Sequence, residues 1–132
     1  MKTIILSMLF IPNALGEGYV INKVNVTNLY EYVTMTTYTA SAKETDSTPL
    51  ITASGFKLDS LNPKKHRIIA VSRDLKSKWK FGTKVKILNA GIYNGVYYVK
   101  DLMNKRFKSR IDILINADDK PTKLHNIKIV KI

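Results

Sequence analysis

Short runs of β-branched and aromatic residues recur along the chain, and polar segments separate them. Such runs favour extended backbone, so from residue 33 onward the pattern predicts strands at fairly regular intervals. The predicted strands are residues 33–40, 51–55, 68–72, 85–88, 96–99, 111–115 and 127–130. No segment has a sustained apolar period of 3.6, so the only helix expected is about one turn in residues 73–79. We therefore predict an all-β domain, a small barrel or a sandwich.

One carboxylate lies inside an apolar run. Asp112 stands between two isoleucines, where burying a charge is costly. Because side chains alternate along a strand, the three isoleucines of residues 111–115 share one face and Asp112 lies on the other. Two interpretations are open. Asp112 either points to solvent in a weak surface pair with Arg110, or it belongs to a functional site.

The first residues have the layout of a secretory signal peptide. Lys2 precedes an apolar run, residues 4–11, and Pro12 and small residues follow up to Gly16. The run is too short to cross a bilayer, so no transmembrane span is expected. The alternative is that residues 1–16 are retained and form an ordinary strand. Residues 17–32 are predicted to be a connecting arm or an edge strand, and residues 33–132 the folded domain.

Composition narrows the classes of function. At 132 residues the chain is long enough for one domain with a modest core. It has no cysteine and only two histidines, His66 and His125, which argues against a metal centre, and no cofactor is predicted. The net charge of +12 favours a polyanionic partner: nucleic acid, an acidic membrane surface or an anionic cell wall. A solvated, solubilising surface would have the same composition.

The common catalytic motifs are missing from the sequence. It contains no phosphate-binding loop, no HExxH, no GxSxG and no calcium-binding loop. Ser54 has no histidine placed by sequence to activate it. Carboxylates remain, and these suit glycosidic chemistry, in which a protonated acid donates to the leaving oxygen.

Six motifs in a fixed order resemble the three-aspartate (3D) domain. They are TYTA (37–40), TDSTPLITASG (45–55), IAVSRDL (69–75), FGTKVKI (81–87), YVKD (98–101) and RIDIL (110–114). The 3D family is similar to the rare lipoprotein A barrel and to the C-terminal part of membrane-bound lytic transglycosylase A. The resemblance covers residues 35–132. It implies a six-stranded double-psi β-barrel, which agrees with the strand pattern.

The same resemblance implies which residues act. The three namesake aspartates would be Asp46, Asp101 and Asp112. In related lytic transglycosylases the aspartate of the IDL-like strand is the catalytic acid, which here is Asp112. Asp101 would hold or polarise it, and Asp46 would lie at the rim. Relatives often have a glycine pair after the YVKD-like motif, where this chain has residues 102–104 (LMN).

Further residues are expected to contact the substrate. They are Tyr38, Thr52, Ser54, Tyr98, Asn104, Arg106 and Arg110. Tyr97 and Tyr98 face opposite ways in a strand, so one is expected in the core and the other as a platform for a sugar ring. Trp79, among lysines, is expected to be exposed. The alternatives for Asp46 and Asp101 are structural, because aspartate in loops and at strand ends bonds nearby backbone amides.

Two functions from different classes follow. The first is a secreted or envelope enzyme that cleaves peptidoglycan, drawn to an anionic wall polymer by its charge. The second is a non-catalytic glycan-binding or structural module of a larger assembly, such as a bacteriophage virion or lysis component. Nucleic acid ranks third, because a secretory leader would place the protein in the wrong compartment. We expect Asp101 and Asp112 to lie on adjacent strands and to face one groove, whose depth separates the first two functions.

Overall fold

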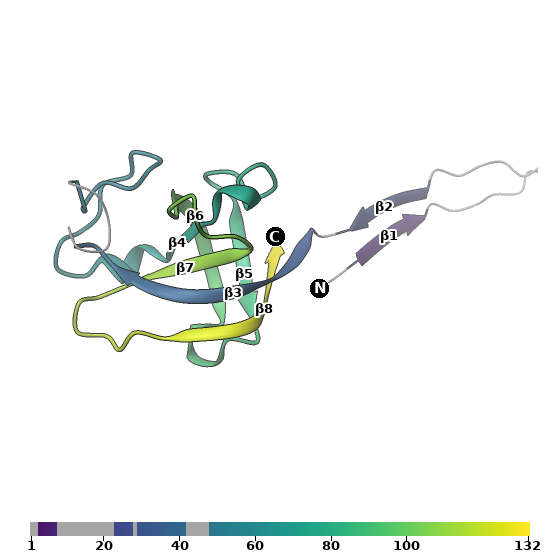
Figure 1. The fold of residues 1–132 in the computed structure, drawn as a ribbon. Helices are drawn as coiled ribbons and strands as arrows, with labels where there is room; N and C mark the ends of the chain where they lie inside the picture. Colours follow the sequence, from purple (N-terminus) through teal and green to yellow (C-terminus); the bar gives the residue numbers. More distant parts are fainter. Residues whose placement is uncertain (1–2, 8–22, 28, 42–47) are drawn as a thin grey trace, which may run out of the picture.

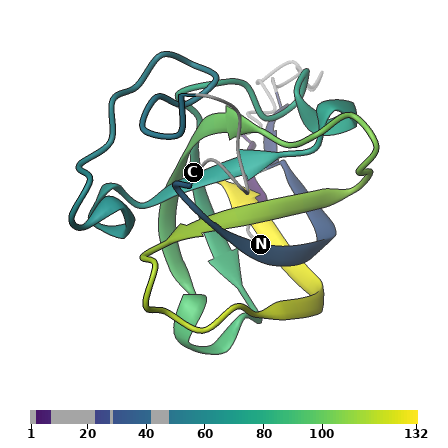
Figure 2. The same ribbon diagram turned by 60° about the vertical axis from the view of Figure 1, so that its left-hand side comes forward.

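Six strands close into a barrel in the order β3-β7-β4-β6-β5-β8 (Figures 1 and 2). The structure, a computed structural model, describes residues 3–7, 23–27, 29–41 and 48–132. The barrel strands are β3 (Tyr30–Thr39), β4 (Ile68–Val71), β5 (Lys84–Leu88), β6 (Gly95–Leu102), β7 (Arg110–Ile115) and β8 (Lys123–Lys131). Within the described ranges the helical segments are short 3₁₀ turns: η1 (Pro63–His66), η2 (Arg73–Leu75) and η3 (Gly91–Tyr93). The predicted all-β fold and the closed six-stranded barrel are confirmed.

Two connections cross over a strand, and they determine the shape of the molecule's outer surface. Strands β3 and β7 are parallel, as are β4 and β6, while the other neighbours are antiparallel. Residues 40–67 link β3 to β4 although β7 lies between them, and residues 103–109 link β6 to β7 although β4 lies between them. These strand directions place the two crossovers at opposite ends of the strands.

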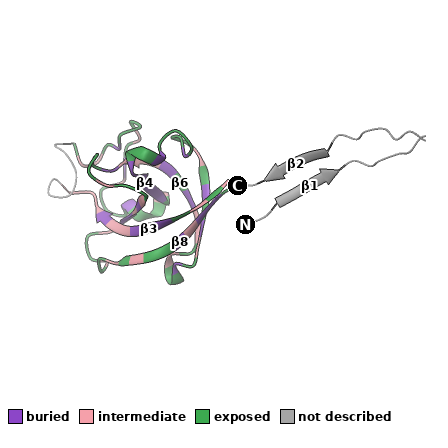
Figure 3. Cartoon of the chain, turned by 45° about the vertical axis from the view of Figure 1, so that its right-hand side comes forward, coloured by how far each residue is buried: buried purple, intermediate pink, exposed green. Residues whose placement is uncertain are grey.

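The barrel interior is filled by the residues that alternation predicts. The isoleucines of β7 face inward, since Ile111, Ile113 and Ile115 are all in the main core cluster. Figure 3 shows the resulting alternation of buried and exposed positions along the strands. Trp79 corrects the prediction of an exposed ring. It has no exposed surface, packs in the same core, and its Nε1 donates to Glu31 Oε1 at 3.1 Å.

Residues 51–55 are not a barrel strand, contrary to the prediction. A single bridge joins Ile51 to Lys57, and the residues between them form a tight turn. Gly55 takes a φ of +89°, a conformation that glycine adopts without strain. The β-branched residues of this run therefore belong to a loop on the barrel surface.

The predicted leader and arm contain two further strands. Strand β1 (Thr3–Ser7) pairs antiparallel with β2 (Lys23–Thr27), with Thr3 opposite Thr27. The barrel itself begins at Tyr30, inside the predicted arm, and Leu29 packs against its core. The predicted signal peptide stays a prediction, and residues 1–2 and 8–16 of it lie outside the described residues.

Candidate functional site

The register of four strands brings Asp101 and Asp112, two of the three aspartates predicted to act, into one row. Thr36 of β3 pairs with Asp112 of β7, Asp112 pairs with Ala70 of β4, and Ala70 pairs with Asp101 of β6. Partners in register share a face, and Ile111 and Ile113 face the core, so this row faces outward. Asp101 and Asp112 are not on adjacent strands, which corrects that expectation. With β4 between them, their Cα atoms are roughly 9–10 Å apart.

A cavity of about 480 Å³ lies over this row. Its size is within the range typical of small-ligand pockets. Both carboxylates line it, so the prediction of one shared groove is confirmed. The other lining residues are Tyr38, Pro49, Ile51, Ala53, Ala70, Arg73, Leu102, Met103, Asn104, Arg106 and Phe107. Most of these come from the two crossover connections, which form the walls, while the strand row forms the floor.

Asp101 is held by three donors from three parts of the chain. The Tyr38 hydroxyl donates to its Oδ2 at 2.8 Å. The backbone N–H groups of Ala53 and Leu102 donate to its Oδ1 at 2.8 and 3.0 Å. Charge-assisted bonds of this kind are among the stronger ones in proteins. Asp101 therefore joins the wall loop of residues 48–58 to β6 and β3, and the interpretation of Asp101 as a turn former alone is too narrow.

Tyr38 is a buried hydroxyl beside both carboxylates. Only 7% of the residue is exposed, and its ring packs in a second apolar cluster outside the barrel with Leu58, Ile68 and Leu114. Burial raises the pKa of Tyr38 well above its ordinary value of 10.0, and the negative charges of Asp101 and Asp112 add to the shift. The phenol is therefore neutral at physiological pH and donates its hydrogen bond to Asp101.

Asp112 lies partly buried on the floor of the groove. The hydroxyl of Thr36, on the neighbouring strand, donates a short hydrogen bond to its Oδ1 at 2.6 Å. This contact fixes the carboxylate in the outward row. Asp112 is thus a positioned group within a ligand-sized cavity, which departs from the interpretation of a solvent-facing residue in a weak surface pair.

Of the predicted residues on β6, on β7 and in the loop between them, some line the groove and others do not. Asn104 and Arg106 line the groove as expected. Arg110 lies behind the wall, because its guanidinium stacks on Phe107 at 4.7 Å, as does that of Arg106 at 4.6 Å. Tyr97 is in the core and Tyr98 is 38% exposed on β6, so the predicted core and surface positions of the pair are confirmed. Tyr98 does not line the cavity, and its role as a platform for a sugar ring stays a prediction.

Thr52 and Ser54 shape the wall loop and do not line the cavity. Thr52 is 5% exposed, and its Oγ1 accepts the backbone N–H of Phe56 at 3.1 Å. Its hydroxyl also lies 3.0 Å from that of Ser54, whose backbone N–H donates to the Lys100 carbonyl at 3.2 Å. They act as turn residues. Asp46, predicted at the rim, lies outside the described residues.

Sequence reasoning missed several groove residues. Ala70, Arg73 and Phe107, which line the cavity, were not proposed, although the first two belong to IAVSRDL. Thr36, which bonds Asp112 and directly precedes the TYTA motif, was not proposed either. Arg73 also donates through Nε to the Met103 carbonyl at 3.1 Å and so braces the opposite wall. The signal that could have found Ala70 is its size, because only a small residue leaves space between two outward carboxylates.

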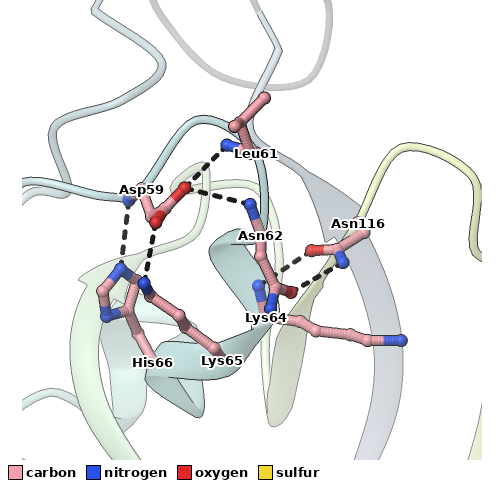
Figure 4. A network of polar contacts seen from close by, with 7 residues as sticks. All are labelled: Asp59, Leu61, Asn62, Lys64, Lys65, His66 and Asn116. Carbon is pink, nitrogen blue, oxygen red and sulfur yellow. Dashed lines mark hydrogen bonds and ion pairs between the residues drawn. The ribbon is translucent and has the colours of Figure 1, made fainter.

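A second polar cluster lies in the loop before β4 (Figure 4). Asp59 Oδ1 accepts the backbone N–H groups of Leu61 and Asn62 at 2.8 and 3.1 Å. Its Oδ2 pairs with Lys65 Nζ at 2.7 Å, and its own N–H donates to His66 Nε2 at 3.0 Å. The bond to Lys65 and the two amides lower the pKa of Asp59 to about 2. These contacts stabilise the loop, and the described part of the chain has no cluster of three or more potential metal ligands.

Comparisons of the chain with protein-family models, with curated proteins and with solved structures gave no match. The resemblance to the 3D domain therefore rests on the motifs alone. Within the described ranges, none of the helical segments has the length and apolar character needed to cross a bilayer.

Proposed function

We propose that the protein is a glycan-cleaving enzyme of the lytic transglycosylase type, acting on peptidoglycan, with Asp112 as its general acid and base. One observation supports this most: two outward carboxylates line the same cavity of about 480 Å³, separated by the small Ala70. A surface that served only assembly would not need charged groups within a cavity of this size.

The chemistry requires one carboxyl group that changes its protonation state. Asp112, protonated, donates its proton to the glycosidic oxygen as the bond from C1 to that oxygen breaks. The resulting carboxylate then accepts the proton of the sugar's own 6-hydroxyl, whose oxygen closes on C1 to form an anhydro ring. Asp112 ends protonated, no water is consumed, and the enzyme is ready for another cycle.

The second carboxylate has a different role in this proposal. Asp101 already accepts three hydrogen bonds from the protein, so its oxygens are engaged in holding the wall loop and Tyr38. We assign it to positioning. The arginines of the walls, Arg73 and Arg106, supply positive charge for an anionic substrate, consistent with the net charge of +12. The proposed compartment is the cell envelope or the exterior, which the predicted leader would reach.

The test is the release of anhydro-muropeptides from purified cell wall, measured by mass spectrometry for the wild type and for Asp112→Asn. Asparagine keeps an Oδ1 that accepts the Thr36 hydroxyl, so the fold should persist, but its amide has no acidic proton to transfer to the glycosidic oxygen. Loss of a general acid typically reduces the rate by about 10²–10⁴. Asp101→Asn should reduce the rate less, because its Oδ1 still accepts the two backbone amides.

Asp118→Asn is the matched control, since Asp118 is exposed on the turn between β7 and β8. It should release product at the wild-type rate. If the wild type releases no anhydro product, or if Asp112→Asn matches it, the catalytic proposal is wrong. A wild type that binds the glycan without cleaving it would instead identify a non-catalytic binding module.

A further inference from the structure

Strands β5 and β8, which are antiparallel neighbours, contain lysines and no carboxylate. Lys84 and Lys86 are on β5, and Lys123, Lys128 and Lys131 are on β8. Two lysines on one face of a strand are about 7 Å apart along it. The register places Lys86 opposite Val130, so Lys128 is its diagonal neighbour across the pair, roughly 7–8 Å away. Like charges this close repel one another, so the cluster is a cost to folding that a bound polyanion would relieve.

Alternation shows which of these side chains point outward. Val85 and Ile87 are in the core, so Lys84 and Lys86 lie on the outer face of β5. Ile127 and Ile129 are in the core too, which places Lys128 on the same outer face. We call this surface the basic face; with its aromatic neighbours it consists of Tyr30, Tyr32, Lys84, Lys86, Tyr98 and Lys128.

The exposed tyrosines of the basic face orient a cation. Tyr30 and Tyr32 meet edge to face, with ring centroids 6.1 Å apart. The ammonium of Lys128 lies 4.7 Å from the first ring centroid and 5.8 Å from the second. Attraction between an ammonium and an aromatic face reduces the freedom of the lysine side chain before any ligand binds. Binding would therefore cost less side-chain entropy, because Lys128 is already ordered in the free protein.

The lysines of the basic face, on β5 and β8, are centred opposite the groove, although both sites include residues of β3 and β6. The groove row is centred on Ala70 of β4, and β8 is three positions from β4 around the six-stranded ring. A long polymer held at β5 and β8 would therefore leave the groove open to a second chain. The nearest acidic residue of β3, Glu31, is directed elsewhere, since it bonds Trp79 and Lys78.

We propose that the basic face binds a flexible phosphodiester polymer of the polyol-phosphate type and so holds the protein on an anionic surface while the groove stays free. Lysine ammonium groups bind phosphates as point charges, without the directional requirement of arginine. Nucleic acid offers the same phosphates, but its binding without sequence preference also uses open aromatic faces for base stacking. Here Lys128 interacts with the rings of Tyr30 and Tyr32, which favours a polymer that has no bases.

The experiment measures binding of a poly(glycerol phosphate) chain by fluorescence anisotropy, at 50 and 200 mM salt. The test variant combines Lys84→Gln, Lys86→Gln and Lys128→Gln, which keep long polar side chains and remove three charges. Each neutralised phosphate contributes a slope of about −0.7 in log affinity against log salt for a single strand. For the triple variant, the slope of log affinity against log salt should therefore be less negative by about 2. Its affinity at 50 mM salt should fall at least ~10-fold.

The control makes the same charge change at exposed loop lysines that are not part of β5, β8 or the basic face: Lys57→Gln, Lys105→Gln and Lys120→Gln. It should keep most of the wild-type affinity. Equal losses in the two triple variants would show that only net charge matters and would overturn the proposal. So would tighter binding of an oligothymidylate with the same number of phosphates, which would assign the face to nucleic acid.

This proposal does not depend on cleavage in the groove. The readout is binding of a polymer without glycosidic bonds, so the groove's chemistry cannot produce or abolish the signal. An inactive protein that binds the polymer through the basic face would refute the proposed enzyme and support this inference. If the protein cleaves peptidoglycan and the triple variant binds the polymer as well as the wild type does, the proposed enzyme is supported and this inference is refuted.

Discussion

Replacing Tyr38 by Phe tests whether the floor of the groove is organised around Asp101. The substitution removes one hydroxyl and leaves the aromatic ring in its cluster with Leu58 and Ile68. The lost contact is the 2.8 Å bond from the hydroxyl to Asp101 Oδ2. Any change in stability therefore reports that bond, because the packing of the ring is unchanged.

The magnitude follows from the geometry of the bond. A hydrogen bond to a charged group contributes about 1.5–3 kcal/mol to the free energy of unfolding. Asp101 is only partly buried and lines an open cavity, so water can replace the missing hydroxyl and the lower end of that range applies. We expect Tyr38→Phe to reduce the free energy of unfolding by ~1.5 kcal/mol. For a domain of this size that corresponds to roughly 6–12 °C in Tm.

The assay is denaturant unfolding of the wild type, Tyr38→Phe, Asp101→Asn and the double variant. A hydrogen bond to a neutral acceptor is about half as strong as one to a carboxylate. The penalty for removing the hydroxyl should therefore fall by about half in the Asp101→Asn background. The pKa of Tyr38 is raised in the folded protein, so its stabilisation is complete below pH 10, the ordinary value, and declines as the pH rises above it.

Two results would refute this reasoning. One is a loss below ~0.5 kcal/mol in Tyr38→Phe, the level at which surface substitutions typically lie. The other is an equal penalty in both backgrounds, which would mean that the hydroxyl and Asp101 do not interact.

Two further predictions concern the loop before β4 and the core of the barrel. The pKa of Asp59 is lowered to about 2, so the stabilisation it gives is present above the ordinary value of 3.8 and is lost as the pH falls toward 2. Acid unfolding followed by circular dichroism should show a shallower decline in this window for Asp59→Asn, and an unchanged profile would contradict the assignment. Trp79→Phe should cost ~1–3 kcal/mol, because it leaves Glu31 without its indole donor and opens space in a close-packed core. Tryptophan emission of the wild type should be blue-shifted, and a spectrum typical of a ring in water would contradict the burial of Trp79.

Local pattern was enough to predict the strands and their faces. The alternation in residues 111–115 places the isoleucines of β7 inside and Asp112 outside, because a period of two is a property of the extended backbone itself. The same reasoning separated Tyr97 from Tyr98. Pattern failed at two places. One run had the composition of a strand but no neighbouring strand, and one residue lay among charged neighbours but was buried. Residues 51–55 have no neighbouring strand to pair with beyond one bridge, and Trp79 packs inward although lysines precede and follow it.

The site itself depends on which strands become neighbours. Periodicity reports the face of a residue only where the strand is regular, and it does not report which strand lies beside it. Alternation places Asp112 outward, but it would place Asp101 inward with Val99. A register shift between β4 and β6 turns Asp101 outward, opposite Ala70. Tyr38 and Asp101 are 63 positions apart along the chain, and their bond exists only because β3, β7, β4 and β6 close in that order. The sequence alone determined the charge, most of the strands and the faces of residues in their regular parts. Closure of the barrel decided the groove, because the strand order and register that place its residues together come from contacts between distant parts of the chain.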